Sequence, residues 1–261
     1  MARRDTPPLP SNHACRSDGI PAFTGRRWAL VVPLILALMF SPSRSVGAET
    51  RPTLYVFLHT DVKSTVLEKT LQGSLPDLVV TVFGRFRDFE QALSAHPPDA
   101  VLALQPLLEA RKLSATLRGI GQGRDVEPYV LMSVGNPLAG SLAGRTIGVV
   151  DLLGRTDTQT FVLALLKAPE ARLKLVTKLE DLLSLLQFAA ADAILVPARI
   201  VKSFTERSRL SLQVRALPDV AVGRASVAVL TPAARATVVR GIERLDVATN
   251  QLMGVESWRE R

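Results

Sequence analysis

Short apolar runs alternate with segments of helical periodicity from residue 52 to residue 261, and this alternation limits the fold more than any other feature of the sequence. The run 53–59 combines apolar, β-branched and aromatic residues, which predicts a buried strand. The segment 62–71 places apolar residues at helical spacing. Further predicted strands are 78–83, 99–104, 117–121, 129–134, 145–150, 173–177, 192–196, 210–217 and 226–230. Further predicted helices are 88–95, 106–114, 156–167, 179–190, 197–207 and 232–253. Strands that alternate with helices form right-handed βαβ units, so the sequence predicts an α/β fold with parallel sheets.

A stretch rich in glycine and proline at 135–144 interrupts the alternation. A strand–helix series lies on each side of this break, and the chain length allows two small lobes. We therefore expect two α/β lobes joined by a hinge.

Residues 1–48 have the pattern of an export signal. Arg26 and Arg27 precede the apolar run 28–40, which has the length of a signal-peptide core and is shorter than the roughly 20 residues of a membrane span. Small residues at Val46 and Ala48 predict cleavage after Ala48 and a periplasmic location. No cysteine follows the apolar run, so a lipid anchor is not expected. The two arginines also fit a twin-arginine signal, although an ordinary basic n-region is the simpler interpretation.

Charge and composition change once this leader is set aside. The whole chain has 32 Lys and Arg against 24 Asp and Glu, a net charge of +8, which by itself suggests nucleic acid or a membrane surface as a partner. Residues 1–48 hold six of the arginines and two of the aspartates, so the remainder carries only +4 and nucleic acid is not expected. The single cysteine, Cys15, also lies in the leader, and only His59 and His96 remain as histidines. We expect no disulfide, no metal site and no cofactor.

The sequence contains none of the common catalytic motifs. It has no G-x-S-x-G elbow, no H-E-x-x-H pair and no phosphate-binding P-loop. The glycine-rich stretch 119–123 lacks the helix and the acidic partner that a nucleotide loop requires. We therefore expect a binding protein rather than an enzyme.

Three short stretches carry a resemblance to a known family. They are the polar turn His59-Thr-Asp-Val-Lys-Ser64, the segment Ser141-Leu-Ala-Gly-Arg-Thr-Ile-Gly-Val-Val150, and the strand Ala191-Asp-Ala-Ile-Leu-Val196. With the leader and the two lobes, they resemble the type 2 periplasmic-binding-protein fold, and within it the phosphate, phosphite and phosphonate receptors of ABC transporters. The resemblance implies that the chain crosses twice between lobes, at 129–135 and 217–225. It divides the chain into a leader at 1–48, lobe one at 49–134, lobe two at 135–224, and a return to lobe one at 225–261.

Candidate ligand-binding residues follow from the strand ends. In open α/β sheets the ligand crevice lies beyond the carboxyl ends of the strands, where helix N-termini favour anions. In the loop 153–160, Gly154 permits close backbone approach, Arg155 offers a fork for an anion, and threonines offer hydroxyl donors. The candidates are Thr60, Lys63, Ser64, Arg155, Thr156, Thr158 and Arg199. Each has an alternative interpretation: the threonines as helix caps, Lys63 as a solvated helix charge, and Arg199 as a residue outside the cleft.

These features predict an exported solute-binding protein that takes a small anionic ligand, such as a phosphonate or phosphate, for an ABC-type importer or a membrane sensor. Few aromatic residues remain after the leader, with Trp258 the only tryptophan, and this argues against sugars and quaternary amines. The alternative is an exported accessory protein that uses the same fold for protein–protein contacts with an envelope complex.

Overall fold

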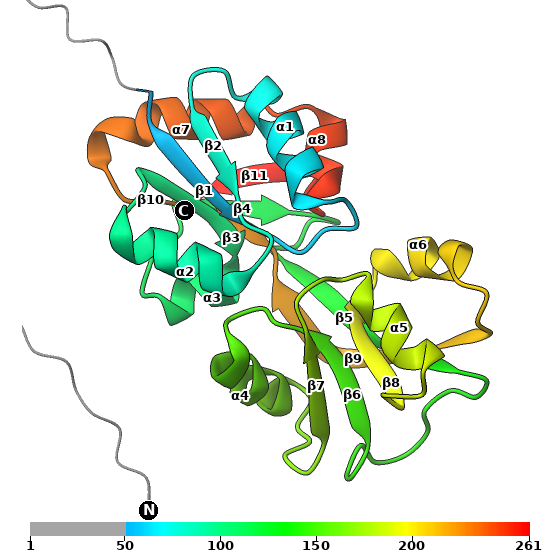
Figure 1. Cartoon of the computed structure of the whole chain (residues 1–261). Coiled ribbons are helices and arrows are strands. Elements are labelled where there is room, and N and C mark those ends of the chain that lie inside the picture. Colours follow the sequence, from blue (N-terminus) through cyan, green and yellow to red (C-terminus); the bar gives the residue numbers. More distant parts are fainter. Residues whose placement is uncertain (1–50) are drawn as a thin grey trace, which may run out of the picture. The chain divides into compact units, whose positions relative to one another are not determined.

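The computed structural model describes residues 51–261, so the predicted leader and its cleavage site lie outside the described residues. The described residues belong to one compact unit and contain two separate sheets, each flanked by helices. Figure 1 shows the two resulting lobes, with β1 in blue in one lobe and β6 in green in the other. Among these residues, no helix has the length and apolar character needed to cross a membrane.

Lobe one holds a six-stranded sheet in the order β11-β4-β10-β3-β1-β2. Its strands are β1 (Thr53–Phe57), β2 (Val79–Val82), β3 (Ala100–Leu104), β4 (Leu117–Ile120), β10 (Ala225–Val229) and β11 (Ser257–Glu260). Its helices are α1 (Ser64–Ser74), α2 (Phe86–Ala95), α3 (Gln105–Ala110), α7 (Arg235–Glu243) and α8 (Val247–Leu252), with a 3-10 turn at Pro232–Ala234. β1 pairs in parallel with β2 and β3, whereas β10 pairs antiparallel with β3 and β4.

Lobe two holds a five-stranded sheet in the order β7-β6-β8-β5-β9. Its strands are β5 (Val126–Val134), β6 (Thr146–Val150), β7 (Arg172–Val176), β8 (Ala193–Pro197) and β9 (Leu212–Gly223). Its helices are α4 (Arg155–Leu165), α5 (Asp181–Gln187) and α6 (Ile200–Arg207). The core of three parallel strands confirms the α/β prediction, but β5 pairs antiparallel with β8 and β9. Both sheets are therefore mixed, because β5 and β10, the first strands after each crossing, enter their sheets antiparallel to their neighbours and are not preceded by a helix.

The chain crosses between lobes at 121–125 and again at Arg224. Because β5 lies in the second sheet, the boundary predicted at residue 134 is displaced, and the predicted hinge 129–135 lies inside lobe two. The strand pattern of this segment does not reveal which sheet the strand will join. The second predicted hinge, 217–225, includes the crossing at Arg224, and β10 returns to the first sheet.

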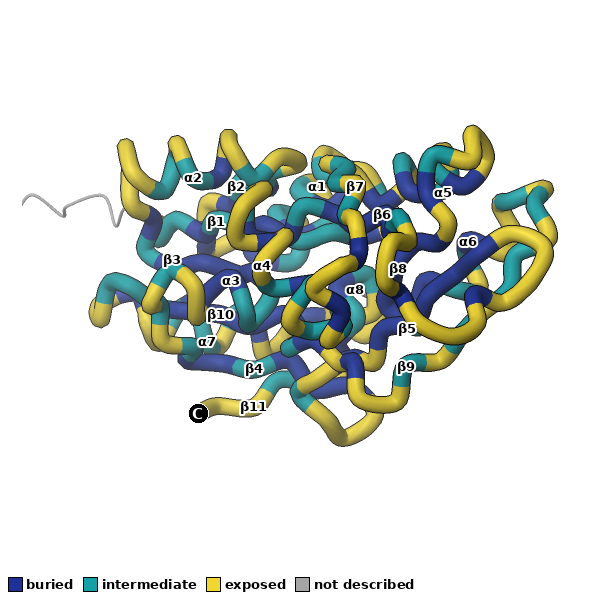
Figure 2. Tube along the Cα trace, turned by 90° about the horizontal axis from the view of Figure 1, so that it is seen from below, coloured by how far each residue is buried: buried dark blue, intermediate teal, exposed yellow. Residues whose placement is uncertain are grey.

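Helices cover both faces of each sheet (Figure 1). In lobe one, α1, α7 and α8 pack on one face, and α2 and α3 pack on the other. In lobe two, α4 covers one face, and α5 and α6 cover the other. Residues of β3 and β8 are buried, whereas the outer turns of the helices are exposed (Figure 2). This burial explains why the central strands are continuous apolar runs.

The C-terminal region differs from its prediction. The helix expected over 232–253 is divided into the 3-10 turn, α7 and α8. The break occurs because Asp246 caps α8, its carboxylate accepting a hydrogen bond from the Thr249 backbone N–H at 2.6 Å. The polar strand β11 was not predicted, because its only apolar residue is Trp258, and it forms by pairing with β4.

Candidate ligand-binding site

A pocket of about 200 Å³ opens between the two lobes. One wall is the turn between β1 and α1, which stands at the carboxyl edge of the first sheet because β1 and β2 are parallel. The other wall is the segment 177–180 that follows β7 in lobe two. The pocket is lined by Leu58, His59, Thr60, Val62, Lys63, Ser64, Thr65, Gly84, Thr177, Lys178, Leu179 and Glu180.

Three predicted ligand residues, Thr60, Lys63 and Ser64, lie together in the lobe-one wall. The Thr60 hydroxyl is buried and donates a hydrogen bond to the Val62 carbonyl at 3.0 Å, which fixes the turn. Lys63 is exposed and extended immediately before α1, and Ser64 is the first residue of that helix. The wall therefore presents a cation beside a helix N-terminus, a combination that favours a negatively charged group.

His59 occupies the same wall and makes contact with the other lobe. Its ring packs edge-to-face on Phe57, with 4.9 Å between ring centroids, and forms a hydrogen bond with the Thr177 backbone. Burial lowers the pKa of His59 to about 4, although the Thr177 bond opposes this shift. The imidazole is therefore neutral near pH 7, and it serves the pocket as a hydrogen-bonding group without charge.

The lobe-two wall brings residues that the sequence analysis missed, namely Thr177, Lys178 and Glu180. A signal for them was present, because they lie at or just after the end of the predicted strand 173–177, and the rule of carboxyl strand ends applies to that strand as well. Lysines from both lobes thus line one pocket.

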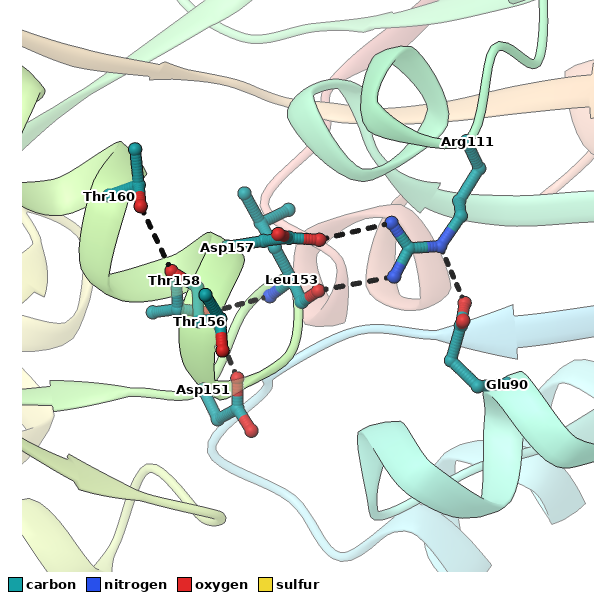
Figure 3. A network of polar contacts seen from close by, with 8 residues as sticks. All are labelled: Glu90, Arg111, Asp151, Leu153, Thr156, Asp157, Thr158 and Thr160. Atoms are coloured by element: carbon teal, nitrogen blue, oxygen red, sulfur yellow. Dashed lines mark hydrogen bonds and ion pairs between the residues drawn. The ribbon is translucent and has the colours of Figure 1, made fainter.

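The predicted loop 153–160 does not line this pocket. Thr158 is fully buried, and its hydroxyl donates to Asp151 at 2.9 Å and accepts from the Leu153 N–H at 2.8 Å (Figure 3). This hydroxyl therefore holds the loop in place. Arg155 and Thr156 are exposed on the first turn of α4.

Lobe one covers the start of α4 with its own side chains, a contact that we call the cleft bridge (Phe86, Arg111, Gly154 and Asp157). Arg111 pairs with Asp157 at 3.3 Å and donates to the Leu153 carbonyl at 3.3 Å (Figure 3). The Nε of Arg111 donates to the Glu90 carboxylate at 2.7 Å. The Arg111 guanidinium also lies 5.2 Å from the centre of the Phe86 ring. Burial alone would lower the pKa of Arg111, but the carboxylates of Glu90 and Asp157 raise it above its usual value.

Gly154 makes the cleft bridge possible. Its φ is +95°, and a Cβ atom there would lie 2.6 Å from the Phe86 ring. Only glycine adopts this backbone conformation readily, and only glycine leaves space for the ring.

Arg199 lies on the hinge side of the lobes, in what we call the hinge cluster (Glu127, Arg199 and Arg224). Arg199 pairs with Glu127 and donates to the His59 carbonyl of lobe one at 3.4 Å. Arg224, at the second crossing, lies 3.9 Å from the same carboxylate and donates to the Gly254 carbonyl. Burial raises the pKa of Glu127, and the two arginines oppose that effect. Arg199 therefore joins the lobes and does not line the pocket, although it contacts the backbone of His59, which does.

Apolar residues fill the centre of the interface between the lobes. Phe57 and Phe89 of lobe one belong to the same hydrophobic cluster as Leu152, Leu153 and Leu179 of lobe two. A central cavity bordered by these lobes has a volume of only about 20 Å³. Among residues 51–261, no three His, Cys, Asp or Glu side chains are grouped to hold a metal ion.

Comparisons with known proteins find similarity at the level of structure. No family model and no curated protein matches the chain. A substrate-binding protein of an amino acid ABC transporter has a TM-score of 0.50 at 15% identity, over 77% of this chain and 96% of the other. XAC2383 from Xanthomonas citri, solved with ATP, has a TM-score of 0.57 at 13% identity, over 80% and 91%. The GluR0 ligand-binding core with L-glutamate has a TM-score of 0.53 at 14% identity, over 80% and 100%.

The chain has the type 2 periplasmic-binding-protein fold. In this binding-protein fold the pocket between the lobes is the natural position for a ligand, since it lies at the carboxyl edge of the parallel strands.

Proposed function

We propose that the protein is an extracytoplasmic solute-binding protein that encloses a small solute with at least one anionic group, and presents it to an ABC-type importer or an envelope sensor. The observation that carries the proposal is the pocket shared by both lobes, in which Lys63 and Lys178 stand on opposite walls. A ligand that contacts both walls stabilises the closed form by its differential affinity for that form.

The pocket chemistry suits a small anion. Hydroxyl groups of Thr60, Ser64 and Thr177 lie among the two lysines, and neutral His59 adds a further polar group. The pocket volume of about 200 Å³ is smaller than that of pockets for drug-sized ligands, which begin at about 300 Å³. Phosphate and phosphonates fit this chemistry. A small amino acid also fits, because Glu180 offers a carboxylate to an ammonium group.

Thermal unfolding with candidate solutes tests the proposal. The purified protein is screened with phosphate, alkylphosphonates, organic acids and L-amino acids at millimolar concentration. Saturation at 100 times Kd stabilises by about 2.7 kcal/mol, which corresponds to a rise in Tm of roughly 5–10 °C for a domain of this size.

Matched variants locate the effect. The double variant K63Q/K178Q removes the pocket cations, and we expect it to lose most of the shift. The control K69Q/K174Q removes exposed lysines of the same two lobes outside the pocket, and should keep it. Failure of every solute to raise the Tm, or equal losses in both variants, contradicts the proposal.

An accessory role is the second candidate, and the closed interface favours it. Phe86, Arg111 and the hinge cluster join the lobes through the protein's own side chains, and the central cavity of about 20 Å³ has room for about one water molecule and not for a solute. Crosslinking in intact cells, followed by identification of an envelope complex captured equally well by the K63Q/K178Q variant, supports this role. Loss of capture in that variant favours solute binding.

A further inference from the structure

A second concave surface lies on lobe one, at the opposite edge of its sheet from the cleft. It is a groove of about 670 Å³ formed by the residues before β1, the turn between α1 and β2, and one side of α7. β1 and β2 are parallel and begin at Thr53 and Val79, so the residues just before them mark the amino edge of the sheet. The ligand pocket lies at the carboxyl edge, and the two sites share no residue.

Three arginines line this groove, which we call the basic groove: Arg51, Arg240 and Arg244. All three are exposed, and none forms an ion pair with a carboxylate of the described part of the chain. Asp77 is the only acidic residue in the lining. The groove therefore concentrates a net positive charge on one surface.

The arginines come from separate elements. Arg240 and Arg244 are four residues apart near the end of α7, a spacing at which like charges destabilise a helix. The negative end of the helix dipole offsets this repulsion for those two residues. Arg51 precedes β1 and gains nothing from that dipole, yet its Nη1 donates to the Pro76 carbonyl at 3.2 Å, which directs the side chain along the groove. An anion that all three contact would remove the repulsion.

Apolar side chains form part of the groove lining, where Pro52, Pro76 and Ala233 reach the surface. Leu75 and Leu78 lie beneath them, each 1% exposed, and Gly241 lets α7 approach, since a Cβ there would lie 3.1 Å from Leu75. The hydroxyls of Ser74 and Thr237 line the same surface. Guanidinium forks match phosphate oxygens, and apolar side chains with hydroxyls beside them suit an attached organic group better than they suit a bare inorganic ion.

We propose that the basic groove binds a phosphate ester, with Arg51, Arg240 and Arg244 on the phosphate oxygens and the organic part beside Pro76 and Ala233. The ester is either a soluble metabolite or the headgroup of an anionic phospholipid, which offer the same chemistry. The proposal is independent of the ligand in the cleft.

Two probes test this site with the purified protein. Glycerol 3-phosphate is titrated by calorimetry, and co-sedimentation compares vesicles of phosphatidylglycerol with vesicles of phosphatidylcholine. We expect saturable binding to at least one anionic probe and none to phosphatidylcholine. In the variant R240Q/R244Q, affinity should fall about tenfold or more, because two phosphate contacts are lost.

Two controls separate this site from general charge and from the cleft. The variant R172Q/R207Q removes two exposed arginines of lobe two that form no ion pair within residues 51–261, so the change in net charge is the same. K63Q/K178Q removes the cleft cations. Both variants should bind the anionic probe with an affinity within about twofold of that of the parent protein, and circular dichroism verifies that every variant is folded.

Binding to vesicles alone identifies a lipid ligand, and binding to glycerol 3-phosphate identifies a soluble ester; either supports the site. The proposal is overturned if neither anionic probe binds, if R240Q/R244Q binds as tightly as the parent, or if either control loses as much.

Discussion

The two lobes touch on two sides, and the two contacts differ in how their charges are placed. In the hinge cluster, the side chains of Glu127 and Arg224 are each 8% exposed, so their charges are removed from water. In the cleft bridge, Asp157 is 56% exposed and Arg111 is 22% exposed. Buried charges are costly to separate, whereas exposed ion pairs contribute little. The hinge side is therefore built to stay closed, and the cleft side is where the lobes can part.

The largest effect should come from the variant E127Q, which leaves Arg199 and Arg224 without their carboxylate. Removing one partner of a buried ion pair typically costs about 3–5 kcal/mol, and Arg224 has little access to water. Urea unfolding measures the loss, with E170Q as a control at an exposed glutamate that forms no ion pair in the described structure. A loss below about 1 kcal/mol would show that the hinge contact resembles a surface pair after all.

The next largest effect is expected for G154A in the cleft bridge. The +95° φ disfavours alanine, and its Cβ would meet Phe86, so we expect a loss of about 2–3 kcal/mol and a larger radius of gyration in solution scattering. G73A is the matched control. Gly73 lies within α1 with no atom near its Cβ position, so alanine should stabilise the protein by about 0.5–1 kcal/mol. Equal behaviour of the two variants would contradict the role of Gly154.

A smaller effect should follow from acid titration of His59, which joins the two walls of the pocket. Its pKa is about 4 when folded and 6.5 when unfolded, so the unfolded chain binds a proton first as the pH falls. The contribution of neutral His59 to the free energy of unfolding is therefore fully present above pH 6.5 and is lost as the pH falls towards 4. We expect a loss of about 2 kcal/mol, after allowance for partial exposure of the ring. Urea unfolding at pH 7 and pH 4.5 measures the decline. The variant H59Q should lose most of this pH dependence in that window, whereas H96Q, which lies in the exposed turn after α2, should retain it.

The smallest effect is expected for the ion pair of the cleft bridge. A double-mutant cycle with R111Q and D157N should give a coupling energy of about 0.5–1 kcal/mol, because Asp157 is mostly exposed. Raising the salt concentration to 1 M should reduce the coupling. A coupling energy as large as the stability lost in E127Q would show that the cleft bridge and the hinge cluster hold the lobes together equally strongly.

The sequence was sufficient for the order of elements, because each central strand is a short apolar run and each covering helix has one apolar face. It was insufficient for β5 and β11. The pattern of β5 specifies a buried strand without specifying its sheet, and β11 is polar and depends on pairing with β4. Such long-range pairing leaves no local signal in the residues themselves.

The candidate site was predictable where a strand end leads directly into a helix, as at Thr60, Lys63 and Ser64. It was less predictable where polar side chains form hydrogen bonds or ion pairs within the protein. A threonine at a helix start has the same local pattern whether it faces a ligand or, like Thr158, holds its own loop. The position of Arg199 depends on its ion pair with Glu127, which is 72 residues away in the chain, so no local pattern indicates it.

The position of β10 sets an order for folding. β10 lies between β3 and β4 in the first sheet, although more than 100 residues separate it from either in the chain. Lobe two is continuous, from β5 to β9, and has all its strands as soon as residue 223 has been synthesised. Lobe one lacks its central strand until residue 229 has been synthesised, so β3 and β4 have no strand between them while lobe two is being made. The lobe that the chain starts first is therefore the lobe that it must finish last.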